Sequence, residues 1–452
     1  MKSINPSTGE LIKEYKEHTT NEINGIIQNT ANAFIEWREV PFTERSRLMK
    51  NAAQILRKNI DKYAKLMTLE MGKIIKESRA EVEKCAWVCD YYAEYAEQFL
   101  ADAPVGTDAG KSFVCFAPLG VVLAVMPWNF PFWQVFRFAA PGIMAGNTGL
   151  LKHASNVPGC ALAIEDIFRQ AGFPDYIFST LMIPSTAVEP VIRNPLVKAA
   201  TLTGSEPAGR AVASAAGSEI KKTVLELGGS DPFIVLDDAD LDNCINMAVQ
   251  ARMINTGQSC IAAKRFIVTE RILEEFEKKQ TQNMQSLSVG DPLAADSQVG
   301  PLARPDLVDD LDVQVKKSIE KGARLLCGGK RIAGPGFYYE PTVLSQVKRG
   351  MPVYHQETFG PVMAIIPVKD THEAIEVAND SEFGLGASLW SQDLVNAEKL
   401  ARQIETGAVF INGMVKSDPR LPFGGIKKSG YGRELAEYGI KEFVNIKSVW
   451  IA

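Results

Sequence analysis

Apolar residues in the first hundred positions recur at spacings of three and four, with charged residues between them, which is the period of amphipathic helices. The pattern predicts helices through Leu56, Tyr63 and Met67 and another over 74–99, after a short extended piece at 13–15. Residues 101–111 are polar and contain glycine. We therefore expect a linker there, followed by a strand over 112–116.

The middle of the chain differs, because short runs rich in Val, Leu and Ile alternate with helical stretches. Strands are predicted over 120–126, 149–152, 197–202 and 232–236, and helices near 131–144, 158–170 and 207–216. From about residue 240 a second series follows, with strands over 265–268, 362–367, 386–390 and 407–411 and helices near 371–379 and 395–405. Such alternation indicates α/β architecture, with parallel sheets covered on both faces and nucleotides bound at the carboxyl ends of strands.

Composition is typical of a globular protein, since 46% of the 452 residues are hydrophobic and 23% are charged. This length allows two or three domains. The 49 Lys and Arg against 54 Asp and Glu leave a net charge of -5, so no basic field would hold nucleic acid or an anionic membrane. We expect neither as a partner.

Signals for export, membrane insertion and metal binding are weak. The N-terminal MKSINPSTGEL lacks the apolar core of a secretory leader. The longest apolar stretch, 120–133, is interrupted by Pro127, Asn129 and Pro131, and a spanning helix needs roughly 18–20 apolar residues. Seven scattered cysteines and four histidines suggest neither a disulfide framework nor a zinc cluster. We therefore expect a cytoplasmic protein without a metal.

The turn after the predicted strand 197–202 has features of an anion site. Gly204 to Gly209 reads GSEPAG, in which Ser205 suits a helix N-cap and Pro207 the first turn. The helix start would offer backbone N–H groups and a positive dipole end to a phosphate. The spacing differs from the usual GxGxxG, and many strand-to-helix turns use Gly and Ser for geometry alone, so both interpretations stay open.

Three residues could carry chemistry. Cys260 ends the polar turn NTGQSC, where free backbone N–H groups favour a thiolate, although a lone cysteine is most often a small buried residue. Glu226 stands in the apolar run TVLELGG, where a carboxylate is costly unless it is paired, neutral or functional. Asn129, in MPWNFPFW, could donate its amide to an oxyanion or simply satisfy its own turn.

Together these segments resemble the aldehyde dehydrogenase superfamily over nearly the whole chain. Seven motifs occur in the family's order: PWNFP (127–131), LLKHAS (150–155), LTGS (202–205), LELGG (225–229), NTGQSC (255–260), ETFGP (357–361) and FGGIKKSGYGRE (423–434). The longer segments LLKHASNVPG, ELGGSDPFIVL, NTGQSCIAAKRF and FINGMVKSD look most like the short bacterial and archaeal succinate-semialdehyde dehydrogenase group.

The resemblance implies a catalytic role for each candidate. Cys260 would attack the aldehyde carbon to give a thiohemiacetal and, after hydride transfer to the nicotinamide, a thioester. Asn129 and the Cys260 backbone N–H would hold the oxyanion, each donor being worth about 3 kcal/mol of barrier. Glu226 would activate the hydrolytic water. Its presence argues against acyl transfer to coenzyme A or reduction of an acyl phosphate, and the presence of all three argues against a non-catalytic relative.

Cofactor residues also follow from the resemblance. Lys152 would hold the adenosine ribose, and Ser205 with the helix start would hold the pyrophosphate. Glu357 would hold the nicotinamide ribose, with Phe359 beside the ring. The other residues expected at the cofactor site are Pro127, Trp128, Ser155, Gly204 and Gly209.

A substrate such as succinate semialdehyde needs a cation or several donors where its carboxylate lies. The candidates are Trp133, Arg137 one helical turn further on, and Ser417, which the resemblance implies contacts substrate. Lys416 and Arg420 on the same loop as Ser417 could help or could be solvated charges. The alternative substrate is another small aldehyde, such as glutarate semialdehyde, lactaldehyde or glycolaldehyde.

The implied architecture is an aldehyde dehydrogenase fold in three parts. A Rossmann-like cofactor domain would comprise 1–99 and 119–228, an α/β catalytic domain 229–426, and a small β oligomerisation arm 100–118 and 427–452. The strands 112–116 and 444–450 would be exposed edges in a monomer, which pairing between chains would cover. We expect a homodimer or homotetramer.

Ser155 predicts the cofactor preference. Members of the family that prefer NAD often carry a glutamate at this position, whose carboxylate binds the ribose 2′-hydroxyl and would repel a 2′-phosphate. Ser155 with Lys152 can accept that phosphate, so we expect NADP to serve at least as well as NAD. Measuring kcat/KM with both cofactors tests this, and a strong preference for NAD would contradict it.

Overall fold

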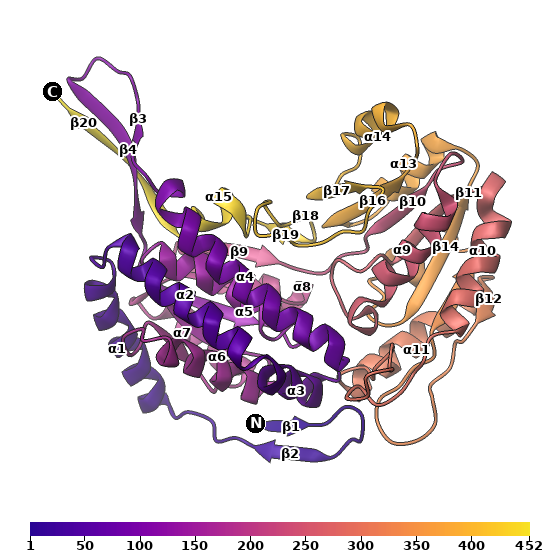
Figure 1. Ribbon diagram of the computed structural model, residues 1–452, viewed down its shortest axis with the longest axis horizontal. Helices are drawn as coiled ribbons and strands as arrows, with labels where there is room; N and C mark the ends of the chain where they lie inside the picture. The colour runs from indigo at the N-terminus through magenta and orange to yellow at the C-terminus, as the bar shows by residue number, and fades with distance from the viewer.

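The computed structural model describes residues 1–452, and the first of its two large sheets has six strands in the order β19-β9-β8-β5-β6-β7 (Figure 1). All neighbouring strands run parallel except the pair of β19 with β9. In chain order they are β5 (Val121–Met126), β6 (Thr148–His153), β7 (Phe178–Thr180), β8 (Val197–Thr203), β9 (Lys222–Glu226) and β19 (Gly430–Tyr431). Helices cover both faces, which is why the central strands are continuous apolar runs.

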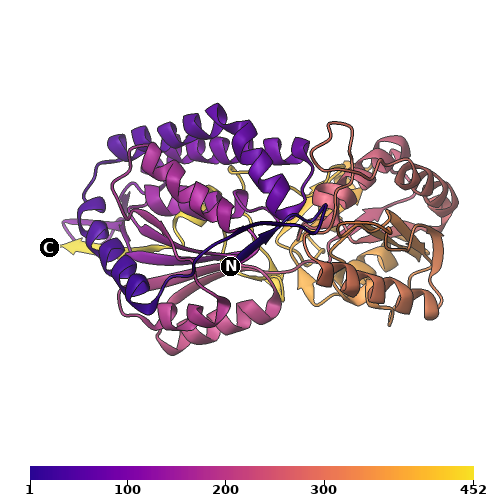
Figure 2. The same ribbon diagram turned by 90° about the horizontal axis from the view of Figure 1, so that it is seen from below.

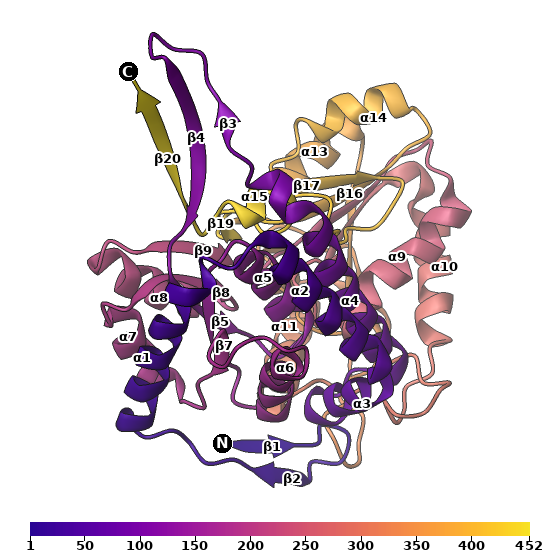
Figure 3. The same cartoon turned by 60° about the vertical axis from the view of Figure 1, so that its left-hand side comes forward.

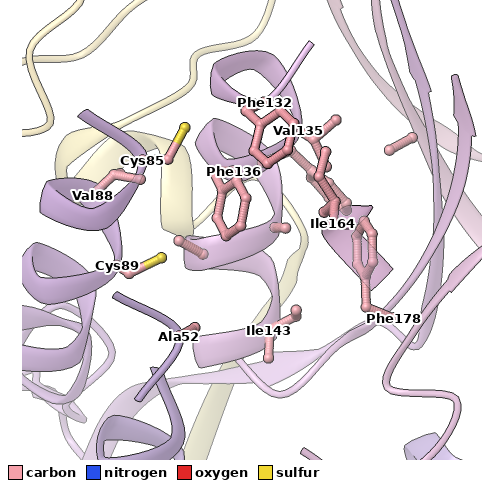
Figure 4. Packing of buried hydrophobic residues seen from close by; sticks show 14 of the residues in the cluster. Ala52, Cys85, Val88, Cys89, Phe132, Val135, Phe136, Ile143, Ile164 and Phe178 are labelled. Carbon is pink, nitrogen blue, oxygen red and sulfur yellow. The ribbon is translucent and has the colours of Figure 1, made fainter. Parts of the chain in front are cut away.

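Alternate side chains of β5 pack against two different helix layers. Val121 and Leu123 pack with the layer of α1 (Thr20–Trp37), α7 (Val188–Arg193) and α8 (Glu206–Ser218). Val122 and Ala124 belong to the larger cluster on the other face. Its helices are α2 (Phe42–Lys58), α3 (Ile60–Met71), α4 (Ile75–Phe99), α5 (Trp133–Met144) and α6 (Pro158–Gln170). Figure 4 shows Phe136 of α5 between the Cys85 and Cys89 turns of α4 and Ile164 of α6.

The second large sheet has seven strands in the order β12-β13-β14-β11-β10-β16-β17, all parallel except the β12–β13 pair. Its strands are β10 (Pro232–Val235), β11 (Arg265–Thr269), β12 (Arg324–Cys327), β13 (Thr342–Ser345), β14 (Val362–Val368), β16 (Gly386–Trp390) and β17 (Ala408–Ile411). One face is covered by α9 (Leu241–Met253) and α10 (Glu270–Gln285), and the other by α11 (Pro305–Glu320), α12 (Pro352–His355), α13 (Thr371–Asn379) and α14 (Leu394–Ala401). Seen from below, the two sheets with their helices lie side by side (Figure 2).

A three-stranded sheet, β20-β4-β3, projects as an arm from the part of the molecule that contains the six-stranded sheet (Figure 3). Its strands are β3 (Ala103–Pro104), β4 (Lys111–Pro118) and β20 (Val444–Ile451). β20 pairs with β4 antiparallel over its whole length, from Val444↔Pro118 to Ile451↔Lys111. The expectation that 112–116 is an exposed edge was therefore wrong, because the chain's own C-terminal strand and β3 cover both of its edges. The outer edges of this sheet are β20 and the two-residue β3.

Smaller elements complete the chain. An N-terminal hairpin joins β1 (Lys2–Ile4) to β2 (Leu11–Glu14), and short 3₁₀ turns occur at Ser185–Ala187 and Ile254–Gly257. β15 (Phe383–Gly384) pairs with β18 (Ile426–Lys427), and α15 (Ala436–Ile440) lies against α4 and α5. None of the helices combines the length and the apolar character needed to cross a bilayer.

The buried carboxylate of Glu81 on α4 binds both Lys73 and the start of α5. The Lys73 ammonium and the Glu81 carboxylate contact each other with almost no exposure, and Lys73 Nζ lies 3.7 Å from the centroid of the Phe130 ring. The second carboxylate oxygen of Glu81 accepts the backbone N–H groups of Phe132 and Trp133, each at 2.9 Å. Glu81 thus satisfies two of the unpaired amides that every helix start carries. It positions the turn that precedes α5.

Replacing Glu81 by alanine should destabilise the protein strongly, because it leaves the Lys73 ammonium buried without a partner. We expect a loss of about 3–5 kcal/mol in the free energy of unfolding. Glu83→Ala is the matched control, since Glu83 lies on the exposed side of α4, where its ion pair with Arg57 is worth at most about 1 kcal/mol. Urea unfolding followed by circular dichroism measures both; similar losses would contradict the assignment.

Candidate active site

Cys260 lies where two cavities meet, between the two large sheets. The cavities have volumes of about 220 and 230 Å³, and Cys260 and Gln134 line both of them. One cavity is bounded by residues of α4 and α5, and the other by the turn after β5 and the start of α8. A sulfur that can be reached from two sides suits a reaction between two bound molecules.

Backbone strain brings Cys260 to this position. After α9 the chain places Asn255, Thr256 and Gly257 in succession in the left-handed region, with φ of 52°, 55° and 76°. For Asn255 and Thr256 this conformation costs on the order of 1–3 kcal/mol each, and it persists only where the surroundings hold it. Gly257 is required by space as well, because a Cβ there would lie 2.2 Å from the carbonyl oxygen of Gly360. The three left-handed residues turn the chain just before Cys260.

Hydrogen bonds from both halves of the molecule hold this turn. The Asn255 side-chain amide donates to the carbonyl oxygens of Asn129 at 2.8 Å and Gln258 at 3.1 Å. The Asn255 backbone N–H donates to the Glu77 carboxylate at 3.0 Å, and Thr256 Oγ1 accepts the N–H of Gly300 at 3.1 Å. Hydrogen bonds to groups from both halves therefore hold the strained turn in place.

Asn129 is oriented by two hydrogen bonds of its own. Its Oδ1 accepts from Gln134 Nε2 at 3.0 Å, and its Nδ2 donates to the Gln258 carbonyl at 3.0 Å. The amide nitrogen therefore faces the cysteine loop and keeps one N–H without a protein acceptor. The backbone N–H of Cys260 also donates to no group in the protein. These two donors are suited to an oxyanion formed next to Cys260.

Burial dominates the electrostatics of the thiol. It raises the pKa of Cys260 to about 12, while the charges of Lys264 and Arg137 act in the opposite direction. Lys264 lies directly beneath the loop, where Nζ donates to the carbonyls of Ser259 at 2.8 Å and Cys260 at 2.5 Å and stands 3.4 Å from Glu357. The expectation that the turn itself favours the thiolate was therefore wrong, because desolvation outweighs the nearby charge.

Glu226, the last residue of β9, is buried outside both cavities. Neither of its carboxylate oxygens has a hydrogen-bond partner, and a Cβ on Gly424 would lie 2.7 Å from Oε1. Burial raises the pKa of Glu226 well above its usual range, and the neighbouring carboxylate of Glu434 raises it further. Both effects favour the neutral carboxyl over the carboxylate.

The second cavity gathers most of the residues expected at a cofactor site. Of these, Pro127, Trp128, Gly204, Ser205, Glu357 and Phe359 line it. Ser205 occupies the N-cap of α8, and because its side chain makes no capping hydrogen bond, the amides at the helix start stay free for an anion. Sequence reasoning missed Thr203, Leu227, Gly228, Arg304 and Leu307, which line the same cavity.

Three other expected cofactor residues lie elsewhere. Lys152 and Ser155 line a separate hollow at the carboxyl end of β6. Gly209 lies inside α8 and lines neither site. A Cβ on Gly209 would come within 2.7 Å of the Leu227 side chain, so this glycine lets α8 pack closely on the chain that follows β9.

The first cavity contains Trp133, Arg137 and Ser417, the residues expected to contact substrate. Arg137 is already engaged there, since it forms a buried ion pair with Glu434 and donates to Thr203 Oγ1 at 3.1 Å. The exposed Lys416 and Arg420 do not line the cavity, and Arg420 pairs with Asp418 at 2.7 Å.

One face of α4 also lines this cavity, and the sequence analysis missed it. Glu77, Glu81 and Lys84 are spaced by four and three residues, so they lie on the same side of the helix. In the sequence they resemble ordinary charges on a helix surface. The spacing was the available signal, but only the packing of α4 against α5 shows that this face is turned inwards.

Comparison with known proteins agrees with this geometry. The model of the aldehyde dehydrogenase family matches residues 1–449. A Synechocystis protein named as a probable NADP(+) succinate-semialdehyde dehydrogenase is 56% identical over 450 residues, covering 100% of this chain and 99% of that protein. Succinate-semialdehyde dehydrogenase (NADP(+)) 1 of Mycobacterium tuberculosis is 50% identical over 453 residues, covering 100% and 99%.

A solved structure is similar along the whole chain. The succinic semialdehyde dehydrogenase of Streptococcus pyogenes, in complex with NADP+ as the cofactor, has 40% sequence identity and a TM-score of 0.98. The match covers 100% of this chain and 99% of that one. At this identity the similarity extends beyond the fold.

Alkylation of Cys260 should accelerate steadily with pH. The thiolate is the reactive form, and a pKa raised to about 12 makes its fraction grow about tenfold per pH unit between pH 7 and 10. We expect the iodoacetamide rate constant, followed by mass spectrometry of the Cys260 peptide without cofactor, to rise accordingly. Lys264→Met should lower the rate at each pH, since it removes the largest favourable charge. A plateau near pH 8.5 would show that burial does not dominate.

Proposed function

The chain belongs to the aldehyde dehydrogenase family, and on this premise we propose that it oxidises succinate semialdehyde to succinate with NADP as the electron acceptor. The enzyme is an oxidoreductase that acts on aldehydes. The observation that carries the proposal is the position of Cys260 between two cavities, one lined by groups that suit the nicotinamide end of a dinucleotide and one with polar groups away from the sulfur. The cavity that contains Trp133 and Ser417 has a volume of about 220 Å³. This is below the roughly 300–1,000 Å³ of pockets for drug-sized ligands, which favours a small substrate.

We assign the nucleophile to Cys260. The sulfur attacks the aldehyde carbon, forming a C–S bond, and the carbonyl electron pair moves onto the oxygen. The Asn129 amide and the Cys260 backbone N–H donate to this oxygen, each contributing about 3 kcal/mol to lowering the barrier. Because the free thiol is held neutral by burial, its proton must leave as the bond forms or just before it.

The cavity on the other side of Cys260 has a lining that suits the nicotinamide end of a dinucleotide. When bound, the oxidised nicotinamide accepts the hydride that leaves the former aldehyde carbon. Phe359 and Trp128 form an aromatic wall, with ring centroids 5.8 Å apart. Ser205 and the start of α8 suit the pyrophosphate, and Glu357 suits ribose hydroxyls. A Cβ on Gly228 would lie 2.4 Å from Glu357 Oε2, so the glycine leaves room for this carboxylate.

The hollow around Lys152 supports the choice of NADP. Lys152 has no carboxylate partner within ion-pair distance, and burial lowers its pKa. Ser155 lines the same hollow, as does Asn156, whose Nδ2 has no hydrogen-bond partner. A cation with two uncharged polar groups suits the 2′-phosphate of NADP better than it suits the 2′-hydroxyl of NAD. Glu17 also lines the hollow, but its charge faces the terminal ammonium at 3.6 Å.

Hydrolysis of the thioester completes the reaction. Water attacks the acyl carbon, the C–S bond breaks, the Cys260 sulfur regains a proton and succinate leaves. We assign the base to Glu226, whose raised pKa makes its carboxylate a stronger base than a solvated one. Since Glu226 lies behind Gly424 and outside both cavities, this role requires the side chain to rotate towards Cys260.

We also propose the division of labour along the chain expected from the sequence: 1–99 and 119–228 bind the cofactor, 229–426 carry the nucleophile, and the arm of 100–118 and 427–452 joins subunits. Support for the arm's role comes from β20, whose Ile446, Trp450 and Ile451 are each about half exposed or more. A second copy of the chain would cover them in a homodimer or homotetramer. The free cysteines support a cytoplasmic location.

A substrate panel tests the proposed function. We expect succinate semialdehyde with NADP to have the highest kcat/KM, at least about tenfold above propanal, because only a carboxylated substrate gains charged hydrogen bonds in the cavity. The other members are glutarate semialdehyde, glycolaldehyde and lactaldehyde, each assayed with both cofactors. Cys260→Ala should abolish turnover, and Ser417→Ala should impair the carboxylated substrates selectively. Equal kcat/KM across the panel would contradict the proposal.

A further inference from the structure

Gln134 shares with Cys260 the point where the two cavities meet, since these two residues line both of them. It is the second residue of α5, and only 2% of its surface is exposed. The side-chain amide of a glutamine has two N–H donors and an oxygen that can accept two hydrogen bonds. Burying these groups is costly unless they find partners inside the protein.

The Gln134 side chain makes a single hydrogen bond within the protein. Its Nε2 donates to Asn129 Oδ1 at 3.0 Å, and its Oε1 has no partner. A buried amide with one hydrogen bond and an unsatisfied oxygen contributes little to the stability of the fold. The contact with Asn129 is therefore the feature that explains a glutamine at this position.

A backbone carbonyl fixes the direction of this hydrogen bond. The oxygen of Gln258 can only accept, and it accepts from the side-chain amides of Asn129 at 3.0 Å and Asn255 at 3.1 Å. Asn129 must therefore present Nδ2 to this carbonyl, which leaves its Oδ1 facing Gln134. Gln134 must then present its amide nitrogen, because its oxygen would face another oxygen there.

The Asn129 side chain thus depends on Gln134 for one of its two restraints. The last torsion of an asparagine side chain has a broad energy profile, so an amide held by one hydrogen bond can rotate. The second N–H of Nδ2, assigned above to the oxyanion, would then point in a range of directions. Stabilisation of an oxyanion requires donors that are oriented before the charge develops.

We propose that Gln134 is a positioning residue, which holds the Asn129 amide in the orientation that stabilises the oxyanion and acts on the reaction only through this amide. The inference rests on the proposed function, because the oxyanion belongs to the reaction assigned to Cys260. The role depends on the Nε2 donor alone. Removing it slows turnover and leaves the fold and the thiol as they are.

Gln134→Met tests the role, since methionine has a similar length and no N–H donor. We expect kcat with succinate semialdehyde and NADP to fall about 10- to 100-fold, a part of the roughly 100- to 1,000-fold that one oxyanion donor is worth. KM should change less. Water in the cavity that Asn129 lines can replace the lost donor without fixing the amide, so the midpoint of urea unfolding should stay nearly the same.

Gln280→Met is the matched control. Gln280 is also buried, donates one hydrogen bond, to the carbonyl of Ile245 at 3.1 Å, and has an Oε1 without a partner. It lies on α10 and lines neither cavity. The substitution removes the same polar groups from a buried site, and we expect kcat to stay at the wild-type value.

A double-mutant cycle shows whether Gln134 acts through Asn129. Asn129→Ala alone should lower kcat roughly 100- to 1,000-fold, as the loss of an oxyanion donor does. In that background Gln134→Met should have no further effect, because the oxygen to which Gln134 donates is already absent.

Alkylation of Cys260 by iodoacetamide provides a readout that involves no oxyanion. The sulfur forms a bond to a saturated carbon while the bond from that carbon to iodide breaks, so the Asn129 amide has no developing charge to stabilise. Gln134 is uncharged and its loss leaves the charges around the thiol unchanged. We therefore expect Gln134→Met to be alkylated at the wild-type rate while its kcat is lowered.

The outcomes distinguish the proposed function from the role of Gln134. If Asn129→Ala leaves kcat unchanged, the oxyanion assignment in the proposed function fails. If Asn129→Ala slows turnover but Gln134→Met does not, or if the two losses multiply in the double variant, the role of Gln134 is overturned. A fall in the alkylation rate equal to the fall in kcat, or a larger loss of stability than in Gln280→Met, would also overturn it.

Discussion

Two hydrogen bonds between side-chain amides and backbone carbonyls hold the reactive cysteine between the two large sheets. The amide of Asn255 donates to the carbonyl of Asn129, and the amide of Asn129 donates to the carbonyl of Gln258. Asn129 follows a strand of the first sheet, whereas Asn255 and Gln258 lie between α9, which covers the second sheet, and β11, which belongs to it. The bonds therefore close the gap between the halves at the position of Cys260, and both cavities exist because this junction is fixed.

Desolvation is the second constraint on the site. Burial raises the pKa of the Cys260 thiol and of the Glu226 carboxyl, and it lowers the pKa of the Lys84 ammonium. In all three cases the shift favours the neutral form. A buried charge without a partner is costly, so the charged form of each group gains stability when a ligand supplies the opposite charge. In this enzyme, binding and chemistry are thus coupled through the same electrostatic cost.

Hydrophobic periodicity predicted the long elements well. The helix expected over 158–170 is α6, and the strands expected after it match β8 and β10 within a residue or two. The three-residue β7 and the short α7 were not predicted, because neither is long enough to complete a periodic pattern. The partner of the strand 112–116 was also missed, since local pattern does not say which distant segment, here 444–451, will pair with it.

The sequence by itself determined the α/β class and the family, and it predicted the roles of Cys260, Asn129 and Glu226, because runs of apolar residues and short motifs are local properties of the chain. Only the tertiary structure decided which charged side chains have an ionic partner inside the protein. Arg137 and Lys84 both carry a formal positive charge, but Arg137 is neutralised by Glu434, nearly three hundred residues away, whereas Lys84 faces the cavity beside Ser417. Ionic partners and solvent exposure depend on contacts between segments far apart in the chain, and these contacts set the free energy of each charge.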